Sequence, residues 1–251
     1  MPKIVVFDSG LGSLSVIRYL QKRVTAEIIY FADQASYPYG TKTVRQLDKI
    51  IKSTISKLQE KFDPDVIIVG SNTPSLLLDI EKKNKIIGVF PPLKEAAFKT
   101  KYGQIGILAT KSVVKSKTLD NYIRKNISPK IQVTKINATQ LVDLVESGKF
   151  ISQKQISKKI IKKVIVPYLE NNIDVFTLSS THLPFLLPIL KGLFPNVLFL
   201  DPADSVAQRV SKILKHKKSK KSRLKIYASG NVKTFHQQLI KIGIKNKVSS
   251  L

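Results

Sequence analysis

Two stretches of the sequence repeat one pattern, and this pattern constrains the fold more than any other feature of the chain. Each is a short apolar run of β-forming residues that ends abruptly in small hydroxyl and amide side chains (residues 65–73 and 174–184). Such a run is typical of a buried parallel strand whose carboxyl end carries polar groups, which is where open α/β sheets bind ligands. Three residues have the same spacing in both runs: Asp65, Val66 and Ser71 in the first, and Asp174, Val175 and Ser180 in the second. The repeat predicts two similar half-domains that face one cleft, although any two strand–helix units can resemble each other this closely.

Strand and helix patterns alternate along the whole chain. The expected strands are 3–7, 27–32, 66–69, 86–90, 105–109, 131–136, a run from 175, 197–200 and, as the last, 224–228. The expected helices are 14–22, 44–61, a segment from 74, 140–146, 153–170, 203–215 and 232–242. This alternation predicts an α/β fold with mainly parallel sheets flanked by helices. We expect Pro91 and Pro92 to form a hinge into a second half.

Composition narrows the class of protein. A chain of 251 residues with 43% hydrophobic content buries a sizeable core and favours two packed subdomains. The most apolar stretch, 183–200, is interrupted by three prolines and a lysine, so we expect no membrane span. The chain enters a strand at once without a signal-peptide pattern, so a cytoplasmic location is the default expectation. The absence of cysteine excludes disulfides, thiolate metal ligands and thiol catalysis, and with three histidines we expect no metal site.

The net charge of +26 raises the alternative of nucleic-acid binding, because lysines can release counterions from phosphates. The lysines are nevertheless scattered over most of the chain. The densest run, 215–225, holds seven basic residues and no aromatic side chain for base stacking. We therefore interpret this run as a solvated surface or linker and do not expect a nucleic-acid partner.

A glycine-containing turn follows the first strand, Asp8-Ser9-Gly10-Leu11-Gly12. It offers a carboxylate, a hydroxyl and backbone N–H groups at the start of a helix, a place that can bind an anion. It lacks the third glycine of a dinucleotide-binding turn, and Asp8 would repel a pyrophosphate. The alternative is that Asp8 is a turn or cap residue.

Further polar residues are candidates for one site. His182 and Glu146 suit a general base and the carboxylate that orients it, although a single loop histidine is often a structural group. The sets Ser71, Asn72, Thr73 and Ser179, Ser180, Thr181 suit a small ligand with carboxylate and ammonium groups, and they also suit helix N-capping. The residues alone therefore predict a cleft for a small polar molecule.

Five motifs of the sequence, in order, resemble the glutamate racemase family over essentially the whole chain. They are 8–14, Pro38-Tyr39-Gly40, Ser71-Asn72-Thr73, Leu141-Val142 with Val145-Glu146, and Ser180-Thr181-His182-Leu183-Pro184. The resemblance implies two pseudo-symmetric α/β subdomains, residues 1–92 plus 203–251 and residues 93–202, with the ligand cleft between them. It also implies interconversion of L- and D-glutamate without a cofactor, by two cysteines on opposite faces of the substrate. A small dicarboxylic amino acid such as glutamate is the implied partner, and a homodimer is an assembly that the resemblance allows.

The resemblance also assigns roles to residues of this chain. An aspartate assists the first cysteine of the family, and a glutamate and a histidine assist the second, which corresponds to Asp8, Glu146 and His182 here. The implied substrate contacts are Asp8, Ser9, Tyr39, Gly40, Asn72, Thr73, Thr181 and His182.

The chain departs from the family pattern at the reacting groups, because both family cysteines correspond to serine here, Ser71 and Ser180. A thiol has a pKa near ~8.5, whereas a hydroxyl is closer to water at about 15.7. The gap of roughly 7 units corresponds to about 10 kcal/mol, so we expect racemisation to be severely impaired. The alternative is a non-catalytic amino-acid-binding or regulatory protein. The serines are either engineered or natural, and further departures at Gly70, Ala138, Ser179 and Leu183 favour natural divergence.

Overall fold

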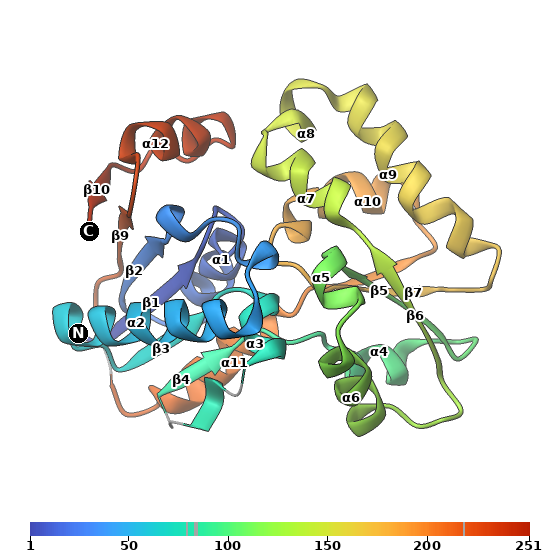
Figure 1. Cartoon of the computed structure of the whole chain (residues 1–251), viewed down its shortest axis with the longest axis horizontal. Helices are drawn as coiled ribbons and strands as arrows, with labels where there is room; N and C mark the ends of the chain where they lie inside the picture. Colours follow the sequence, from blue (N-terminus) through green and yellow to red (C-terminus); the bar gives the residue numbers. More distant parts are fainter. Residues whose placement is uncertain (79, 83–84, 218) are drawn as a thin grey trace.

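The computed structural model describes residues 1–78, 80–82, 85–217 and 219–251, and it contains two parallel β-sheets that lie side by side (Figure 1). The first sheet has six strands: β1 (Lys3–Asp8), β2 (Glu27–Ala32), β3 (Val66–Val69), β4 (Ile86–Gly88), β9 (Arg223–Ala228) and β10 (Val248–Ser250). The second has four: β5 (Gln104–Ala109), β6 (Gln132–Asn137), β7 (Val175–Leu178) and β8 (Leu198–Leu200). Helices flank both sheets, which confirms the predicted fold class.

The two sheets share one strand order. The order β2-β1-β3-β4 within the first sheet matches β6-β5-β7-β8 in the second, and every pairing is parallel. β3 and β7, the two strands of the repeated sequence pattern, therefore occupy equivalent positions. The first sheet is extended by β9 and β10, which the chain reaches after it has completed the second sheet.

Helices and short 3-10 turns connect the strands. The α-helices are α1 (Leu14–Arg23), α2 (Val44–Phe62), α3 (Asn72–Leu77), α4 (Leu93–Lys99), α5 (Lys111–Val114), α6 (Lys117–Asn126), α7 (Thr139–Glu146), α8 (Lys149–Ser152), α9 (Lys154–Leu169), α10 (Leu187–Leu193), α11 (Ala203–Ile213) and α12 (Val232–Lys241). The 3-10 turns are η1 (Gln34–Ser36), η2 (Tyr39–Thr41), η3 (Ile80–Lys82) and η4 (Leu183–Leu186). α2 begins with a capping box in which Thr43 and Gln46 satisfy each other's backbone N–H groups, as its sequence favours.

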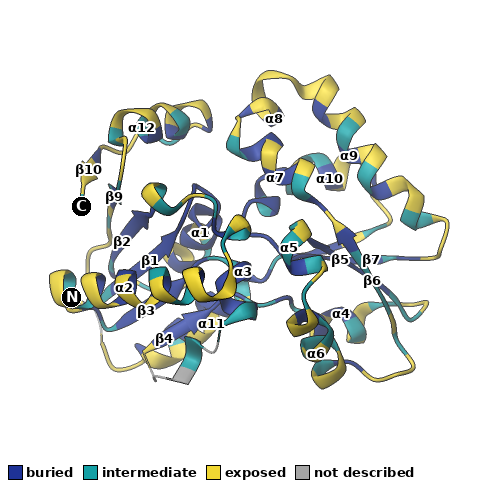
Figure 2. Cartoon of the chain, viewed as in Figure 1, coloured by how far each residue is buried: buried dark blue, intermediate teal, exposed yellow. Residues whose placement is uncertain are grey.

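The apolar core joins the two sheets. The inner strands β1, β2, β3, β5 and β7 are largely buried, whereas the outer faces of α2, α6 and α9 are exposed (Figure 2). One cluster continues from Ile4 and Val6 of the first sheet through Leu183 and Leu186 to Phe176 of the second. α11 follows a strand of the second sheet but packs against α1 on the first, where Asp204 forms an ion pair with Arg23 at 2.7 Å. None of the helices in the described ranges is long and apolar enough to cross a membrane.

Some elements differ from the sequence expectation. The sequence patterns did not reveal α4, α5, α6, α8, α10 or β10. α6 buries only Leu119 fully, with Tyr122 and Ile123 packed partly buried beside it at helical spacing. β10 has three residues, of which two are exposed serines, and it is held by pairing with β9 rather than by its composition. The predicted strand at 224–228 is confirmed as β9, but the expectation that it is the last strand is wrong, because β10 follows it.

The basic run at 215–225 is not simply a solvated linker. Its last part belongs to β9, where Lys225 forms an ion pair with Glu27 at 2.5 Å. Lys217 forms an ion pair with Asp65, whose pKa is below its ordinary value because hydrogen bonds from Lys217 and from the N–H of Lys3 outweigh the opposing effect of burial. Lys218 lies outside the described residues.

Candidate active site

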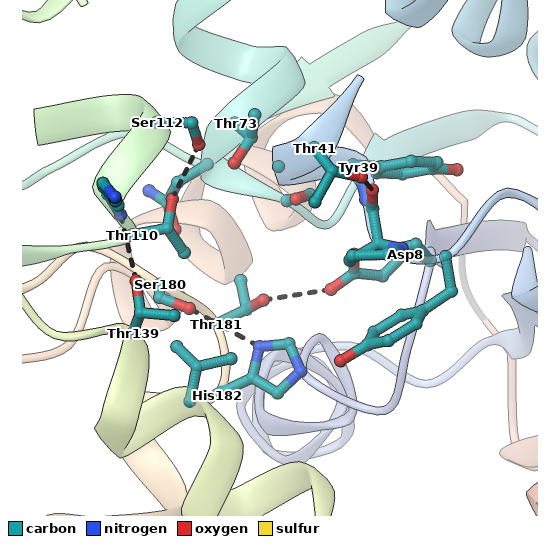
Figure 3. A pocket seen from close by; sticks show the side chains of 18 of the residues that line it. Asp8, Tyr39, Thr41, Thr73, Thr110, Ser112, Thr139, Ser180, Thr181 and His182 are labelled. Atoms are coloured by element: carbon teal, nitrogen blue, oxygen red, sulfur yellow. Dashed lines mark hydrogen bonds between the residues drawn. The ribbon is translucent and has the colours of Figure 1, made fainter. Parts of the chain in front are cut away.

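A cavity of about 490 Å³ lies where the carboxyl ends of the two sheets face each other (Figure 3). Every candidate residue from the sequence lines it except Glu146, which lies behind His182 and is hydrogen-bonded to it. The two sets of strand-end residues, far apart in the sequence, thus meet at one cavity. The lining residues are Asp8, Ser9, Tyr37, Pro38, Tyr39, Gly40, Thr41, Ser71, Asn72, Thr73, Thr110, Lys111, Ser112, Lys115, Thr139, Val142, Asp143, Ser179, Ser180, Thr181 and His182.

Ser71 and Ser180 each follow a strand end with the same backbone hydrogen-bond pattern. The residue after β3 donates its N–H to the penultimate residue of β1 (Gly70 to Phe7 O, 2.7 Å). The residue after β7 does the same to β5 (Ser179 N–H to Leu108 O, 2.8 Å). Each hydrogen bond extends the strand by one step, so that the following serine is placed at the edge of the sheet facing the cavity.

On the β7 side, three side chains form a continuous polar chain. Ser180 Oγ lies 3.5 Å from His182 Nδ1, and His182 Nε2 lies 2.5 Å from Glu146 Oε1. Burial opposes a charge on His182, but the Glu146 carboxylate, with a smaller contribution from Asp8, outweighs this and raises the pKa of His182 above its ordinary value. Because Glu146 Oε1 accepts at Nε2, the neutral imidazole carries its proton there and presents Nδ1 to Ser180 as an acceptor.

Two glycines of the turn after β1 allow Glu146 and His182 to approach it. A Cβ atom on Gly10 would lie 2.1 Å from Glu146 Oε1, and one on Gly12 would lie 2.5 Å from His182 Nδ1. Leu11 N–H donates to Glu146 Oε1 at 3.2 Å. The glycines of this turn therefore serve close packing against the second sheet's residues, a role that the sequence pattern alone did not indicate.

Asp8, the last residue of β1, accepts hydrogen bonds from residues that follow strands of both sheets. Its carboxylate accepts from Ser9 N–H at 2.7 Å and from the Thr181 hydroxyl at 3.1 Å. Desolvation by burial raises the pKa of Asp8 from 3.8 to about 6, although the positive charge of His182 works in the opposite direction. Ser15 of α1 donates to Thr181 O at 2.8 Å, so the segment 8–15 fixes Thr181 from two directions.

The β3 side is less connected. Asn72 donates through Nδ2 to Val89 O at 3.0 Å, while its buried Oδ1 has no hydrogen-bond partner within the described residues. Ser71 is half-buried, and no hydrogen bond of its Oγ is recorded in the described part of the chain. An unsatisfied buried acceptor costs free energy, so Asn72 Oδ1 is a ready acceptor for a ligand donor.

The loop after β2 closes the cavity with its backbone. Tyr39 donates its hydroxyl to Asp33 at 3.0 Å, which directs the ring away from the cavity, while its N–H lies 3.5 Å from Ser9 Oγ. Burial raises the pKa of Tyr39 well above its ordinary value, so the phenol stays neutral. Tyr39 and Gly40 both line the cavity, and the Tyr39 hydroxyl is held by Asp33.

Sequence reasoning missed a third group of lining residues, from the second sheet. Thr110 and Ser112 are hydrogen-bonded to each other at 3.2 Å, and Lys111 N–H donates to Thr139 Oγ1 at 3.1 Å. Lys115 of α5 and Asp143 of α7 also line the cavity. The position of these residues in the sequence could have revealed them. Residues 110–112 follow β5 directly, as Ser9 and Gly10 follow β1, and β5 and β1 hold equivalent places in the two strand orders. Among the residues that the structure describes, no three histidine, aspartate or glutamate side chains are grouped as metal ligands.

The fold and this cavity between two equivalent parallel sheets place the chain in the structural class of amino-acid racemases. The glutamate racemase of Escherichia coli, solved in complex with L-glutamate and the activator UDP-MurNAc-Ala, superposes with a TM-score of 0.82 over 100% of this chain and 98% of that one, at 24% identity. The Campylobacter jejuni glutamate racemase gives a TM-score of 0.70 over 98% of this chain and 100% of that one, at 28% identity.

Sequence comparison gives the family. The glutamate racemase of Aliivibrio fischeri is 34% identical over 222 residues, 85% of this chain and 82% of that protein, and that of Trichodesmium erythraeum is 32% identical over 219 residues, 85% of this chain and 79% of that protein. No family model matches the chain. At this identity and coverage, the chain belongs to the glutamate racemase family.

Proposed function

We propose that the cavity binds a small dicarboxylic amino acid such as glutamate, and that the chain retains the racemase site without its two thiols. The observation that carries the proposal is the equivalent placement of Ser71 and Ser180, which end matching strands and line one cavity. A glutamate racemase of Francisella tularensis, 23% identical over 100% of this chain and 97% of that one, was solved in complex with D-glutamate. Membership of the family and the chemistry of the lining residues together support glutamate as the first ligand to test.

The proposed binding mode assigns one task to each group of residues. Asn72, Thr73 and Thr181 supply hydrogen-bond donors and acceptors, and the backbone at Tyr39 and Gly40 holds a carboxylate. Asp8, assisted by Ser9, faces the ammonium group of the ligand. These tasks need no thiol, so binding is expected to survive at an affinity on the order of 1 μM–1 mM, by analogy with enzyme KM values.

The proposed chemistry is transfer of the α-proton between two faces of the ligand. Asp8 would assist a base at position 71, and His182 with Glu146 would assist a base at position 180. A serine hydroxyl is a far weaker acid than a cysteine thiol, by roughly 7 pKa units. We therefore expect racemisation of L- or D-glutamate to be weak or absent. The alternative function is an amino-acid-binding or regulatory protein without turnover.

Two measurements separate these functions. Calorimetry with D-glutamate, L-glutamate and aspartate tests binding, and deuterium exchange at Cα of glutamate tests proton transfer. Asn72→Ala should weaken binding by about 1–3 kcal/mol because it leaves a buried partner unpaired, whereas the exposed control Asn121→Ala on α6 should not. Heat of binding without exchange would favour the non-catalytic alternative. No heat for any ligand at several millimolar would contradict the proposal.

We also propose that residues 1–92 plus 203–251 and residues 93–202 form the two subdomains. The strand membership of the two sheets supports this division, since 3–88 and 223–250 supply one sheet and 104–200 the other. Limited proteolysis should then cut near residues 92 and 203 before it cuts within either part. A homodimer remains a prediction that analytical ultracentrifugation would test.

A further inference from the structure

We propose that Ser180, His182 and Glu146 form a serine–histidine–glutamate triad that hydrolyses esters of small carboxylic acids through an acyl group on Ser180. This activity goes beyond the proposed racemase function, and it depends on a property that a cysteine at position 180 would not give: a hydroxyl nucleophile beside a histidine base. It needs no cofactor and uses water as its second substrate.

The geometry of the three side chains matches the roles that such a triad requires. The nucleophile and the base are 3.5 Å apart (Ser180 Oγ to His182 Nδ1), and the base and its carboxylate are 2.5 Å apart (His182 Nε2 to Glu146 Oε1). The first distance is at the loose end of a hydrogen bond, as is common for catalytic pairs without substrate. Figure 3 shows Ser180 and His182 pointing toward each other at the wall of the cavity.

Burial and charge favour the arrangement. Ser180 and His182 are 6% and 8% exposed, and the Glu146 side chain is 10% exposed, so bulk water screens their interaction little. Glu146 fixes the tautomer that accepts at Nδ1 and stabilises the imidazolium that forms when the serine proton is taken, which is how the third member of a triad acts. The triad is recognised by geometry and roles rather than by sequence order.

Backbone donors for a developing oxyanion lie next to the nucleophile. The N–H groups of Thr181 and His182 have no recorded hydrogen-bond partner among the described residues. The N–H of the residue after the nucleophile is a common oxyanion donor at serine nucleophiles that follow a strand, and Ser180 follows β7 in this way.

The proposed hydrolysis needs only the ester and water as reactants. Ser180 Oγ bonds to the ester carbonyl carbon, its proton passes to His182 Nδ1, and the carbonyl electron pair moves to the oxygen. The alkoxy group then leaves with that proton, and the acyl group stays on Ser180. Water attacks the acyl carbon and gives a proton to His182, which returns it to Ser180 Oγ, so that one ester and one water yield one acid and one alcohol.

The cavity favours an acyl group that carries a second carboxylate. Lys111 and Lys115 line the same cavity as Ser180 and can pair with that carboxylate. The volume of about 490 Å³ fits a small-metabolite ligand. The expected substrate class is therefore a monoester of a short dicarboxylic acid. Ser71 is not expected to act in the same way, because no histidine is recorded beside it.

A covalent probe tests the nucleophile in the unmodified protein. A fluorophosphonate should add one phosphonyl group, with loss of fluoride, and peptide mapping should place it on Ser180. Ser180→Ala should abolish the label, whereas Ser128→Ala, a change of an exposed serine away from the cavity, should keep it. No label on the folded protein, or a label on any other serine, would overturn the proposal.

Hydrolysis tests the base and the carboxylate. With the mono-para-nitrophenyl ester of glutaric acid, His182→Gln should lower kcat by about 10²–10⁴-fold. The rate should rise with pH to a plateau as His182 loses its proton, and Glu146→Gln should move that rise to lower pH. A circular-dichroism melt establishes that each variant is folded. A rate in folded His182→Gln equal to that of the unmodified protein, or a pH profile unmoved by Glu146→Gln, would overturn the triad.

Discussion

The strands β3 and β7 are alike at their amino ends and different at their carboxyl ends. At the amino ends, Asp65 accepts from Lys3 N–H at 2.8 Å, and Asp174 accepts from Lys101 N–H at 2.7 Å. Each aspartate thus binds the backbone at or just before the start of the neighbouring central strand, β1 or β5. The spacing that the two stretches share in the sequence therefore reflects the same structural task.

At the carboxyl ends the two units diverge. Two residues after Ser180 comes His182, which pairs with Glu146, whereas Ser71 is followed directly by Asn72, which donates to a main-chain carbonyl. The strand beside β3 ends in Asp8, while the equivalent strand beside β7 ends in the apolar Ala109. The comparison teaches that the scaffold is symmetric where it stabilises the sheets and asymmetric where it lines the cavity.

The largest effect is expected when a thiol is introduced at the carboxyl ends of both strands. Ser71→Cys combined with Ser180→Cys should raise Cα deuterium exchange of glutamate by orders of magnitude, because the thiol is a stronger acid by roughly 7 pKa units, or about 10 kcal/mol before compensation by the site. The measurement is proton NMR of D- and L-glutamate in deuterated water.

The single variants are the matched controls. Each should exchange the proton from one face only and give little net inversion. If the double variant binds glutamate and exchanges nothing, Asp8, His182 and Glu146 do not assist the residues at these positions, and the assigned roles are wrong.

A second test compares the loss in free energy of unfolding when a polar side chain is removed at the carboxyl end of β7 and at that of β3. Glu146→Ala leaves His182 and the N–H of Leu11 without their partner, and breaking a buried pair of this kind costs about 3–5 kcal/mol. Asn72→Ala at the other end frees only the Val89 carbonyl and should cost about 1–3 kcal/mol. Urea unfolding measures both. Equal losses would contradict the asymmetry described above.

The third test uses the pH dependence of Asp8. Its folded pKa of about 6 lies above the ordinary 3.8, so between these values the folded protein binds a proton that the unfolded chain has released. Stability should therefore fall as pH rises from about 4 to about 6, by about 3 kcal/mol in total, and stay lower above that range. Asp8→Asn should remove this loss, which urea unfolding at a series of pH values would detect.

Asp201 provides the control for this test. Burial raises its pKa to about 6 as well, but it follows β8 and does not line the cavity. Asp201→Asn should remove a similar pH-dependent loss of stability and leave glutamate binding unchanged. A flat stability profile between pH 4 and 6 in the unmodified protein would show that neither carboxyl is desolvated as described.

The smallest difference is expected at the amino ends. Asp65→Ala removes the acceptor of Lys3 N–H and the partner of Lys217, and Asp174→Ala removes the acceptor of Lys101 N–H and of the Thr100 hydroxyl. Each change should therefore cost about 1–3 kcal/mol, with no change in ligand binding. Thermal melts with and without glutamate measure both quantities. A large loss in one variant and none in the other would break the equivalence of the two units.

The sequence by itself determined the fold class and most of the cavity's strand-end residues. Strand–helix alternation predicted parallel sheets, and an apolar run that stops at hydroxyl side chains indicated where Ser71 and Ser180 leave the sheet. These signals are local, because burial of a parallel strand restricts its composition and the strand's end is marked by the first polar residues. Glu146 was a candidate partner of His182 by residue type alone, and the family motifs gave it the same role.

Tertiary structure alone decided which groups meet. His182 and Glu146 are 36 positions apart in the sequence and come within 2.5 Å because α7 packs over the turn after β1, where Gly10 and Gly12 leave room for both side chains. Thr110, Lys111 and Ser112 reach the cavity because β5 occupies in its sheet the position of β1. β10 exists because β9 offers it an edge. Each of these depends on packing between distant segments, and the physical reason is that hydrogen-bond distance and burial belong to the folded arrangement rather than to the spacing of residues along the chain.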